Sequence, residues 1–322
     1  MKVESGGMES SIIPERSSFS AWPHRLAVVL ACATFPLLFI GGLVTSKGAG
    51  LAVPDWPTTF GYNMFLYPWS AMIGNIFYEH SHRLVAAAVG LLTITLALVF
   101  WLRERRYWLR WLGVAALLLV ILQGVIGGLR VVLLEHTLAI VHAAFAQAFF
   151  ALTVSLAIFT SAQWTGEPAG ELIADGGRLR RLCALTTGLI YIQSVFGAVL
   201  RHTGERADAH LLFAFLVALH VVFILVRVMR SHADRPKLTR PAGFLGFLLL
   251  LQLVLGVGAY FGKFTSMLGL PMGTLVLLTT THLVTGALML VTSLLLTLRG
   301  YRFSTPSKDS VLQKVLTEQF SG

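Results

Sequence analysis

Four histidines are the residues of this chain whose type and spacing suggest chemistry. They lie at or near the outer ends of four alternate apolar segments, at His82, His142, His210 and His282. Helix bundles build cofactor sites from side chains on facing helices, and two imidazoles can hold a haem iron from both sides. Each half of the chain contributes one pair, so the sequence predicts two haem sites. The alternative for any single histidine is a hydrogen bond across a membrane bundle.

The stretch Tyr78-Glu79-His80-Ser81-His82-Arg83 precedes a long apolar run. Glu79 and His82 are three residues apart, so on a helix they share one face, whereas His80 points elsewhere. Ionisable groups at the mouth of a membrane segment are costly and indicate function. We predict that Glu79 handles protons beside His82; the alternative is an ion pair with Arg83. Zinc would need three or four ligands, and the stretch lacks the HExxH order of a metalloprotease.

The composition is that of a polytopic membrane protein. Of the 322 residues, 56% are hydrophobic and only 12% are charged, which is too apolar for an ordinary soluble domain. In a membrane protein, a net charge of +10 is more informative through the places where the basic residues lie, which indicate the orientation of the chain in the membrane. No nucleic-acid partner is predicted. Cys32 and Cys183 both fall in apolar segments and form no CxxC pair, so we infer neither a structural disulfide nor a cysteine metal site.

Eight segments are long enough to cross a membrane, given about 20 apolar residues per crossing. They cover residues 26–45, 84–102, 111–129, 138–162, 182–200, 211–229, 242–261 and 274–298. The predicted fold is an all-α integral membrane bundle of eight transmembrane helices.

The basic residues predict the orientation. They gather after the second and eighth spans, before the fifth, and between the sixth and seventh. The positive-inside rule then places both termini in the cytoplasm. The first residues carry Glu4, Glu9 and Glu15, which is unlike a cleaved signal or a transit peptide. This favours a bacterial inner (plasma) membrane over the mitochondrial one.

The chain also repeats itself. The run at 41–48 ends the first span and the run at 197–204 ends the fifth, while Gln123…Gly127 and Gln252…Gly256 occupy equivalent places in the third and seventh. We predict two pseudo-symmetric four-helix halves, at 26–162 and 182–300. A cytoplasmic tail (1–25), a cytoplasmic linker (163–181) and a second tail (301–322) complete the chain. The aromatic-rich outer loop at 46–78 is expected to cover the first half.

Several other residues have open alternatives. His220 lies about 15 Å deeper than His210, so it is either a packed polar residue or the true ligand in place of His210. Arg83, Arg130 and Arg201 lie at the outer membrane edge, where each can bind a haem propionate or reach the lipid headgroups. The outer residues His136 and His202 have the same choice between a propionate and solvent.

Taken together, these features resemble the haem A synthase (CtaA/COX15) family. The resemblance rests on Gly-Ala-Gly-Leu-x-x-Pro-Asp-Trp-Pro at 48–57, Glu-x-x-His-Arg at 79–83, Leu-Arg-His-Thr-Gly at 200–204, and single histidines in the fourth and eighth spans. It covers residues 26–300.

The resemblance implies oxidation of the C8 methyl of haem O to a formyl group, which gives haem A for cytochrome oxidase. It implies that haem O lies between His82 and His142, that a haem b cofactor lies between His210 and His282, and that Glu79 is the essential glutamate. Glu79 would transfer a proton or stabilise positive charge. Implied partners are haem O synthase, cytochrome oxidase assembly proteins and an electron donor or acceptor, and a homo-oligomer is left open.

The sequence departs from the family pattern in two places. Many bacterial members carry outer-loop cysteines, whereas this chain has Val53 where one often sits. His210 is followed by Leu211 and not by an arginine, which keeps His220 as the alternative ligand.

Two other functions compete with haem A synthesis. One is a membrane b-type cytochrome for electron transfer, and the other is a haem carrier or transporter.

Overall fold

The computed structural model describes residues 21–166, 176–265, 267 and 269–304. The main helices are α1 (Ala21–Ser46), α2 (Gly74–Arg103), α3 (Tyr107–Leu133), α4 (His136–Thr160), α6 (Gly176–Thr203), α7 (Ala207–Ser231), α8 (Pro236–Phe264) and α9 (Met272–Ser304). Two short helices, η1 (Trp69–Ala71) and α5 (Ala162–Thr165), accompany them. The eight main helices are all long and apolar enough to span a membrane. The prediction of an all-α integral membrane protein with eight spans is confirmed.

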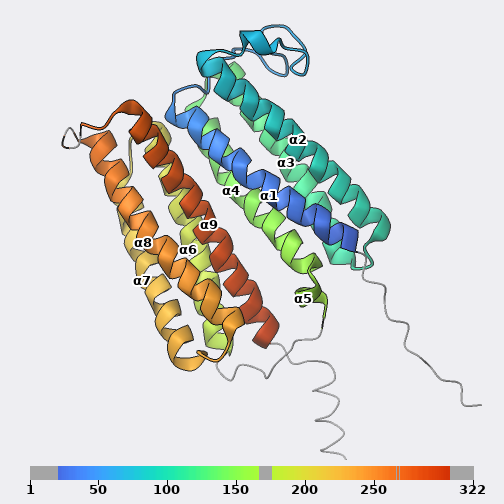
Figure 1. The fold of residues 1–322 in the computed structure, drawn as a ribbon, viewed down its shortest axis with the longest axis vertical. Coiled ribbons are helices and arrows are strands. Elements are labelled where there is room, and N and C mark those ends of the chain that lie inside the picture. Colours follow the sequence, from blue (N-terminus) through green and yellow to red (C-terminus); the bar gives the residue numbers. More distant parts are fainter. Residues whose placement is uncertain (1–20, 167–175, 266, 268, 305–322) are drawn as a thin grey trace, which may run out of the picture.

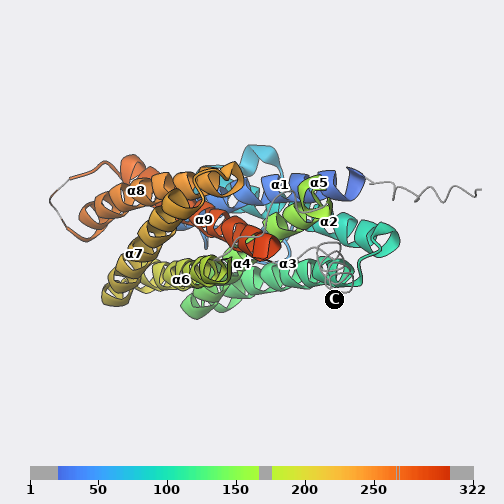
Figure 2. The same ribbon diagram turned by 90° about the horizontal axis from the view of Figure 1, so that it is seen from below.

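The helices pack as two groups of four (Figure 1). In the N-terminal group, α1 to α4 contact one another in sequence and α4 returns to α1; in the C-terminal group, α6 to α9 do the same. Figure 2 shows the two groups side by side, and contacts of α1 with α9 and of α4 with α6 and α9 join them. The pseudo-symmetry of the halves stays a prediction, as do the domain boundaries at 26–162 and 182–300.

Buried apolar clusters fill each group and the seam between them. The seam cluster contains Leu38 of α1, Phe150 of α4, and Ala287 and Val291 of α9. Close packing of this kind, and not the exclusion of water, drives helices together in lipid. The two groups are therefore joined by α1 and α4 on one side and by α6 and α9 on the other.

The helices run further than the apolar segments predicted. Helix α2 begins at Gly74, so the connecting loop is 47–73 and not 46–78, and His82 lies about two turns inside the helix. Helix also extends into parts of the predicted tails and linker, at residues 21–25, 176–181 and 301–304. Parts of these segments (1–20, 167–175 and 305–322) lie outside the described residues. A span predicted from hydropathy stops at the first charged residues. The helix itself can extend past them where the charged side chains find partners.

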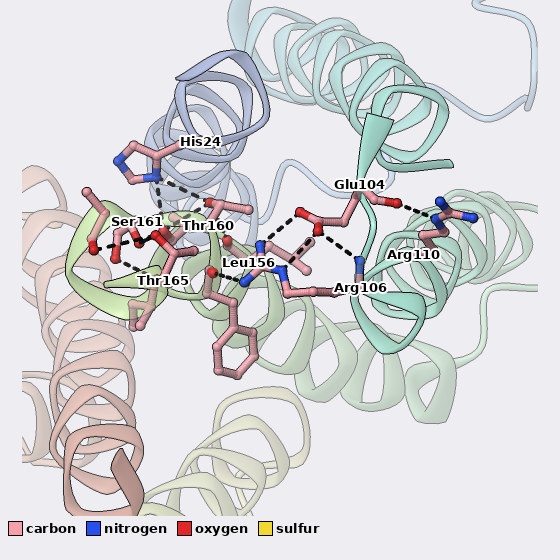
Figure 3. A network of polar contacts seen from close by, with 12 residues as sticks. His24, Glu104, Arg106, Arg110, Leu156, Thr160, Ser161 and Thr165 are labelled. Carbon is pink, nitrogen blue, oxygen red and sulfur yellow. Dashed lines mark hydrogen bonds and ion pairs between the residues drawn. The ribbon is translucent and has the colours of Figure 1, made fainter. Parts of the chain in front are cut away.

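The end of the bundle that carries loop 47–73 is called the loop end below. At the opposite end, side chains satisfy the last carbonyls of α4, which have no partner within their own helix (Figure 3). His24 Nδ1 contacts the Ala157 carbonyl at 3.1 Å, and Arg106 donates to the Phe159 carbonyl at 2.8 Å. Burial alone would raise the pKa of Glu104, but hydrogen bonds from Arg106 outweigh it and lower that pKa. These bonds tie the start of α1 and the α2–α3 turn to the end of α4.

Candidate functional site

Each of the four predicted histidines lies against a glycine of the preceding main helix. Measured from the position that a Cβ atom would take at the glycine, the imidazole Cε1 lies at 3.1 Å for Gly41 and His82, 3.2 Å for Gly127 and His142, 3.2 Å for Gly197 and His210, and 2.9 Å for Gly256 and His282. A side chain at any of these glycines would crowd the ring. Glycine therefore lets each imidazole lie close to the neighbouring backbone.

The four rings lie in the third of their helices nearest the loop end, one on each of α2, α4, α7 and α9. The ring centroids of His210 and His282 are 6.4 Å apart. An iron held by two imidazoles at about 2 Å from each nitrogen places the centroids about 6 Å apart. The ring spacing in the C-terminal group thus fits a haem iron between His210 and His282.

The rings also have unused polar atoms. Among the described residues, the buried Nδ1 atoms of His82, His142, His210 and His282 have no hydrogen-bond partner. His82 and His142 lie close enough to interact electrostatically, as do His210 and His282. A buried polar nitrogen without a partner is unfavourable unless a ligand completes it, which is a condition expected of a site built for a metal group.

A glutamine accompanies three of the four rings, each four residues before the ring's glycine. Gln193 Nε2 lies 3.4 Å from His210 Nε2, and Gln252 Nε2 lies 3.3 Å from His282 Nε2. Gln123 instead donates to the backbone carbonyl of His142 at 3.1 Å. Gln123 and Gln252 stand out in the sequence as an internal repeat, whereas Gln193 does not, although its four-residue spacing to Gly197 is the same.

The fourth ring lacks this neighbour. Leu37 takes the glutamine's position, four residues before Gly41 on α1. The position that carries an amide beside His210 and His282 is thus apolar on α1. The two groups offer chemically different surroundings for a bound molecule.

Arg83 joins loop 47–73 to α2. Its guanidinium donates to the carbonyls of Asp55 (2.7 Å), Thr58 (3.0 Å) and Val53 (3.1 Å), and to Glu79 Oε1 (2.7 Å). Glu79 Oε2 accepts the Val53 backbone N–H at 3.0 Å, and the Glu79 side chain is buried. The Glu79–Arg83 ion pair weighed as the alternative is thus present. Any propionate contact of Arg83 would have to compete with these four hydrogen bonds.

His80 has a structural role that the sequence analysis did not assign. Its ring is 1% exposed, its Nδ1 lies 3.1 Å from Thr59 Oγ1, and it packs on Tyr67 with ring centroids 5.1 Å apart. Both contacts are in loop 47–73. The consecutive residues Glu79 and His80 therefore hold two separate parts of the loop on α2.

Asp55 shapes the tip of the same loop. Phe60 and Gly61 both have positive φ, at 52° and 79°, in a two-residue turn closed by paired backbone bonds of Thr59 and Tyr62. The Asp55 carboxylate accepts from the Phe60 N–H (2.7 Å) and the Gly61 N–H (2.9 Å). Desolvation would raise the pKa of Asp55, but bonds from Gly61, Thr58 and Phe60 lower it from 3.8 to about 2.

This pKa predicts a pH limit for the loop. Because the folded pKa of Asp55 lies below its ordinary value, the carboxylate stabilises the loop above pH 3.8, and that contribution disappears as the pH falls towards about 2. Wild-type loop proteolysis by pepsin should accelerate between these values. Asp55→Asn should be cleaved faster already at pH 5, with a weaker pH dependence. Equal profiles for the two proteins would contradict the role of Asp55.

Arg201, His220 and Arg130, the other residues singled out in the sequence, each make different contacts. Arg201 donates to the Gly42 carbonyl at 2.7 Å and to Ser46 Oγ at 2.5 Å, so it links α6 to α1. His220 Nδ1 contacts the Leu216 carbonyl of its own helix at 2.8 Å.

Arg130 packs over Gly50, with Nη2 2.6 Å from the position of a Cβ atom there. Among the described residues, no group of three or more His, Cys, Asp and Glu side chains converges to hold a metal ion.

Comparison with known proteins identifies the family. The profile of the COX15-CtaA family, described as cytochrome oxidase assembly protein, matches residues 24–207, more than half of the chain. The match includes Glu79, His82 and His142, and it ends before His210 and His282.

Relatives named "Heme A synthase" occur in three bacteria. The Shouchella clausii protein is 34% identical over 135 residues (41% of this chain, 44% of the relative), and the Alkalihalophilus pseudofirmus protein is 34% identical over 112 residues (33% and 35%). The Geobacillus kaustophilus protein is 25% identical over 255 residues (70% and 77%). The chain thus spans less than half the length of the first two relatives. On the family profile, the chain belongs to the COX15-CtaA family of cytochrome oxidase assembly proteins.

Proposed function

We propose that this protein is a haem A synthase that oxidises the C8 methyl of haem O to a formyl group. The observation that carries the proposal is the set of four glycine-backed histidines, which form one pair in each helix group. Membership of the COX15-CtaA family and the three relatives named "Heme A synthase" support the same reaction.

In this proposal His82 and His142 hold the substrate haem O, and His210 and His282 hold a haem b cofactor. When bound, the haems supply the redox chemistry. The 6.4 Å spacing of the C-terminal ring centroids supports a bound haem there. In the N-terminal group the α1 position equivalent to the glutamines beside His210 and His282 is Leu37, which offers no amide, and we propose that the haem held there exchanges.

Glu79 acts in this account as a fixed carboxylate. Both oxygens accept hydrogen bonds, one from Arg83 and one from the Val53 N–H. An acceptor-only carboxylate is suited to stabilising positive charge that develops as the methyl carbon is oxidised. To take up a proton it would have to release one of these donors, so of the two roles considered we favour charge stabilisation.

Loop 47–73 would cover the substrate. Arg83, Glu79 and His80 fasten it to the helix that carries His82, and this arrangement supports a dry reaction chamber. We place the loop end on the outer side of a bacterial inner membrane, with both termini in the cytoplasm, following the distribution of basic residues. Haem O synthase, oxidase assembly proteins and an electron donor or acceptor are the expected partners, and a homo-oligomer is compatible with this arrangement.

The test is haem extraction after co-expression with a haem O synthase in a host that makes no haem A. We expect mass analysis to find haem A or its hydroxylated intermediate with the wild-type protein. In Glu79→Gln the product should fall about a hundredfold, the scale of a positioned acid–base or charge-stabilising group, with haem b retained.

The matched control is Glu205→Gln, an exposed carboxylate at the same end. It should leave the product unchanged. Haem b alone in the wild-type protein would overturn the proposal and leave a b-type cytochrome. Haem O that exchanges freely without conversion would leave a carrier.

A further inference from the structure

A pocket lies at the loop end where the two helix groups meet. The N-terminal group supplies Leu51, Arg130, Leu134, Glu135, His136 and Ala139, and the last turn of α6 in the C-terminal group supplies His202. Its volume of about 80 Å³ is several times the space that one water needs. Side chains from both groups thus share one opening.

The pocket is rich in hydrogen-bond donors and lies close to positive charges. Arg130, His136 and His202 line it, and the charges of Arg201 and Lys263 also act on His202. The one acid in the lining, Glu135, is exposed at the rim. Such a set of donors attracts an anion with oxygen acceptors.

The arginines at this end differ in how far their donors are used. Arg83 makes four hydrogen bonds within its own group, and Arg201 bonds to Gly42 and Ser46. Within the described part of the chain, the side chains of Arg130, His136 and His202 make no hydrogen bond or ion pair. A half-buried guanidinium without an acceptor is costly, so a ligand oxyanion would satisfy Arg130.

The position of Arg130 connects the pocket with the first pair of histidines. Arg130 follows Gly127 by three residues on α3, and Gly127 lies against His142. The Arg130 backbone therefore lies about one helical turn, roughly 5 Å, nearer the loop end than Gly127, which contacts the His142 ring. Because Gly50 has no side chain, the guanidinium can lie directly against the loop backbone there.

We infer that this pocket is an oxyanion site built jointly by the two helix groups, with Arg130 as its bidentate donor and His202 and His136 as further donors. A carboxylate or a phosphate has the chemistry to fill it. Two sources are within reach: a propionate of the haem between His82 and His142, which rests on the proposed function, and a phospholipid headgroup. In the first case a residue of the C-terminal group, His202, helps to bind the substrate of the N-terminal group.

The test compares haem with its dimethyl ester, which lacks the propionate charges. The purified full chain in phosphatidylcholine nanodiscs is titrated with each, and binding is followed by the optical spectrum. Arg130→Gln and His202→Ala should each weaken haem binding about tenfold, the scale of one charge-assisted hydrogen bond, and leave ester binding unchanged. Glu135→Gln should tighten haem binding, since it removes a repelling carboxylate.

Arg206→Gln is the control, because Arg206 is exposed and lies 3.6 Å from Asp208 instead of in the pocket. A second arm counts retained phosphatidylglycerol by native mass spectrometry. Loss of that lipid in Arg130→Gln, with haem and ester affected alike, would identify a lipid phosphate as the ligand. If Arg130→Gln changes neither haem affinity nor the amount of retained lipid, the proposed site is wrong. A wild-type protein that binds neither haem nor ester would refute the proposed function, while the lipid arm would still test the pocket.

Discussion

Gly256→Ala is expected to remove most of the haem from the C-terminal group while the N-terminal site remains. The added Cβ would lie 2.9 Å from His282 Cε1, closer than carbon atoms pack, so the imidazole must shift from its present position opposite His210. Overpacking of this kind costs about 1–3 kcal/mol, which corresponds to roughly a five- to 150-fold loss of affinity. Haem stoichiometry and the optical spectrum of the purified variant measure the effect.

Gly243→Ala is the matched control for this variant. It lies on the same helix, α8, and nothing approaches its Cβ position within 4 Å. Alanine favours a helix over glycine by about 1 kcal/mol, so this variant should be as stable as the wild-type protein or more stable. Haem loss of equal size in both variants would refute the claim that Gly256 acts through His282.

Gly128→Ala is expected to detach loop 47–73 from the N-terminal group. The new Cβ would fall 2.2 Å from Trp56 Cδ2, a position that the indole already occupies. Trp56 must then leave α3, and the adjacent Asp55 carbonyl and nearby Val53 carbonyl would lose their bonds from Arg83. We expect conversion of haem O to fall at least about tenfold, because water enters a chamber that should be dry. Haem b content should not change.

The control here is Gly124→Ala, one turn away on α3 with open space around its Cβ position. Limited proteolysis of the loop should be faster in Gly128→Ala than in Gly124→Ala. Wild-type proteolysis and wild-type product yield in Gly128→Ala would show that the loop does not depend on the Trp56 contact.

The sequence predicted the features that depend on local composition. Runs of apolar residues of membrane length predicted eight helices, and the structure has eight. The depth of His82, His142, His210 and His282 could also be counted along those runs, and all four rings lie near one end of the bundle. Both predictions needed only the rise of a helix and the cost of placing polar groups in lipid.

Tertiary contacts decided what the sequence could not predict. The start of α2 was placed about ten residues late, because Glu79, His80 and Arg83 look like the end of a membrane span until their partners in the loop are known. Those partners lie 21 to 30 residues away in the chain. The shared pocket was equally hidden, since Arg130 and His202 belong to different groups and meet only when the groups pack together.

The central claim is that each helix group holds a haem between its own two histidines. The most direct measurement is the haem content and low-temperature optical spectrum of the purified wild-type protein, His142→Ala and His282→Ala, all co-expressed with a haem O synthase. We predict two low-spin haems with paired imidazole ligands in the wild-type protein. His142→Ala should lose only the N-terminal haem, and His282→Ala only the C-terminal one. Loss of both haems in either variant, or of neither, would contradict the assignment of one pair of histidines to each site.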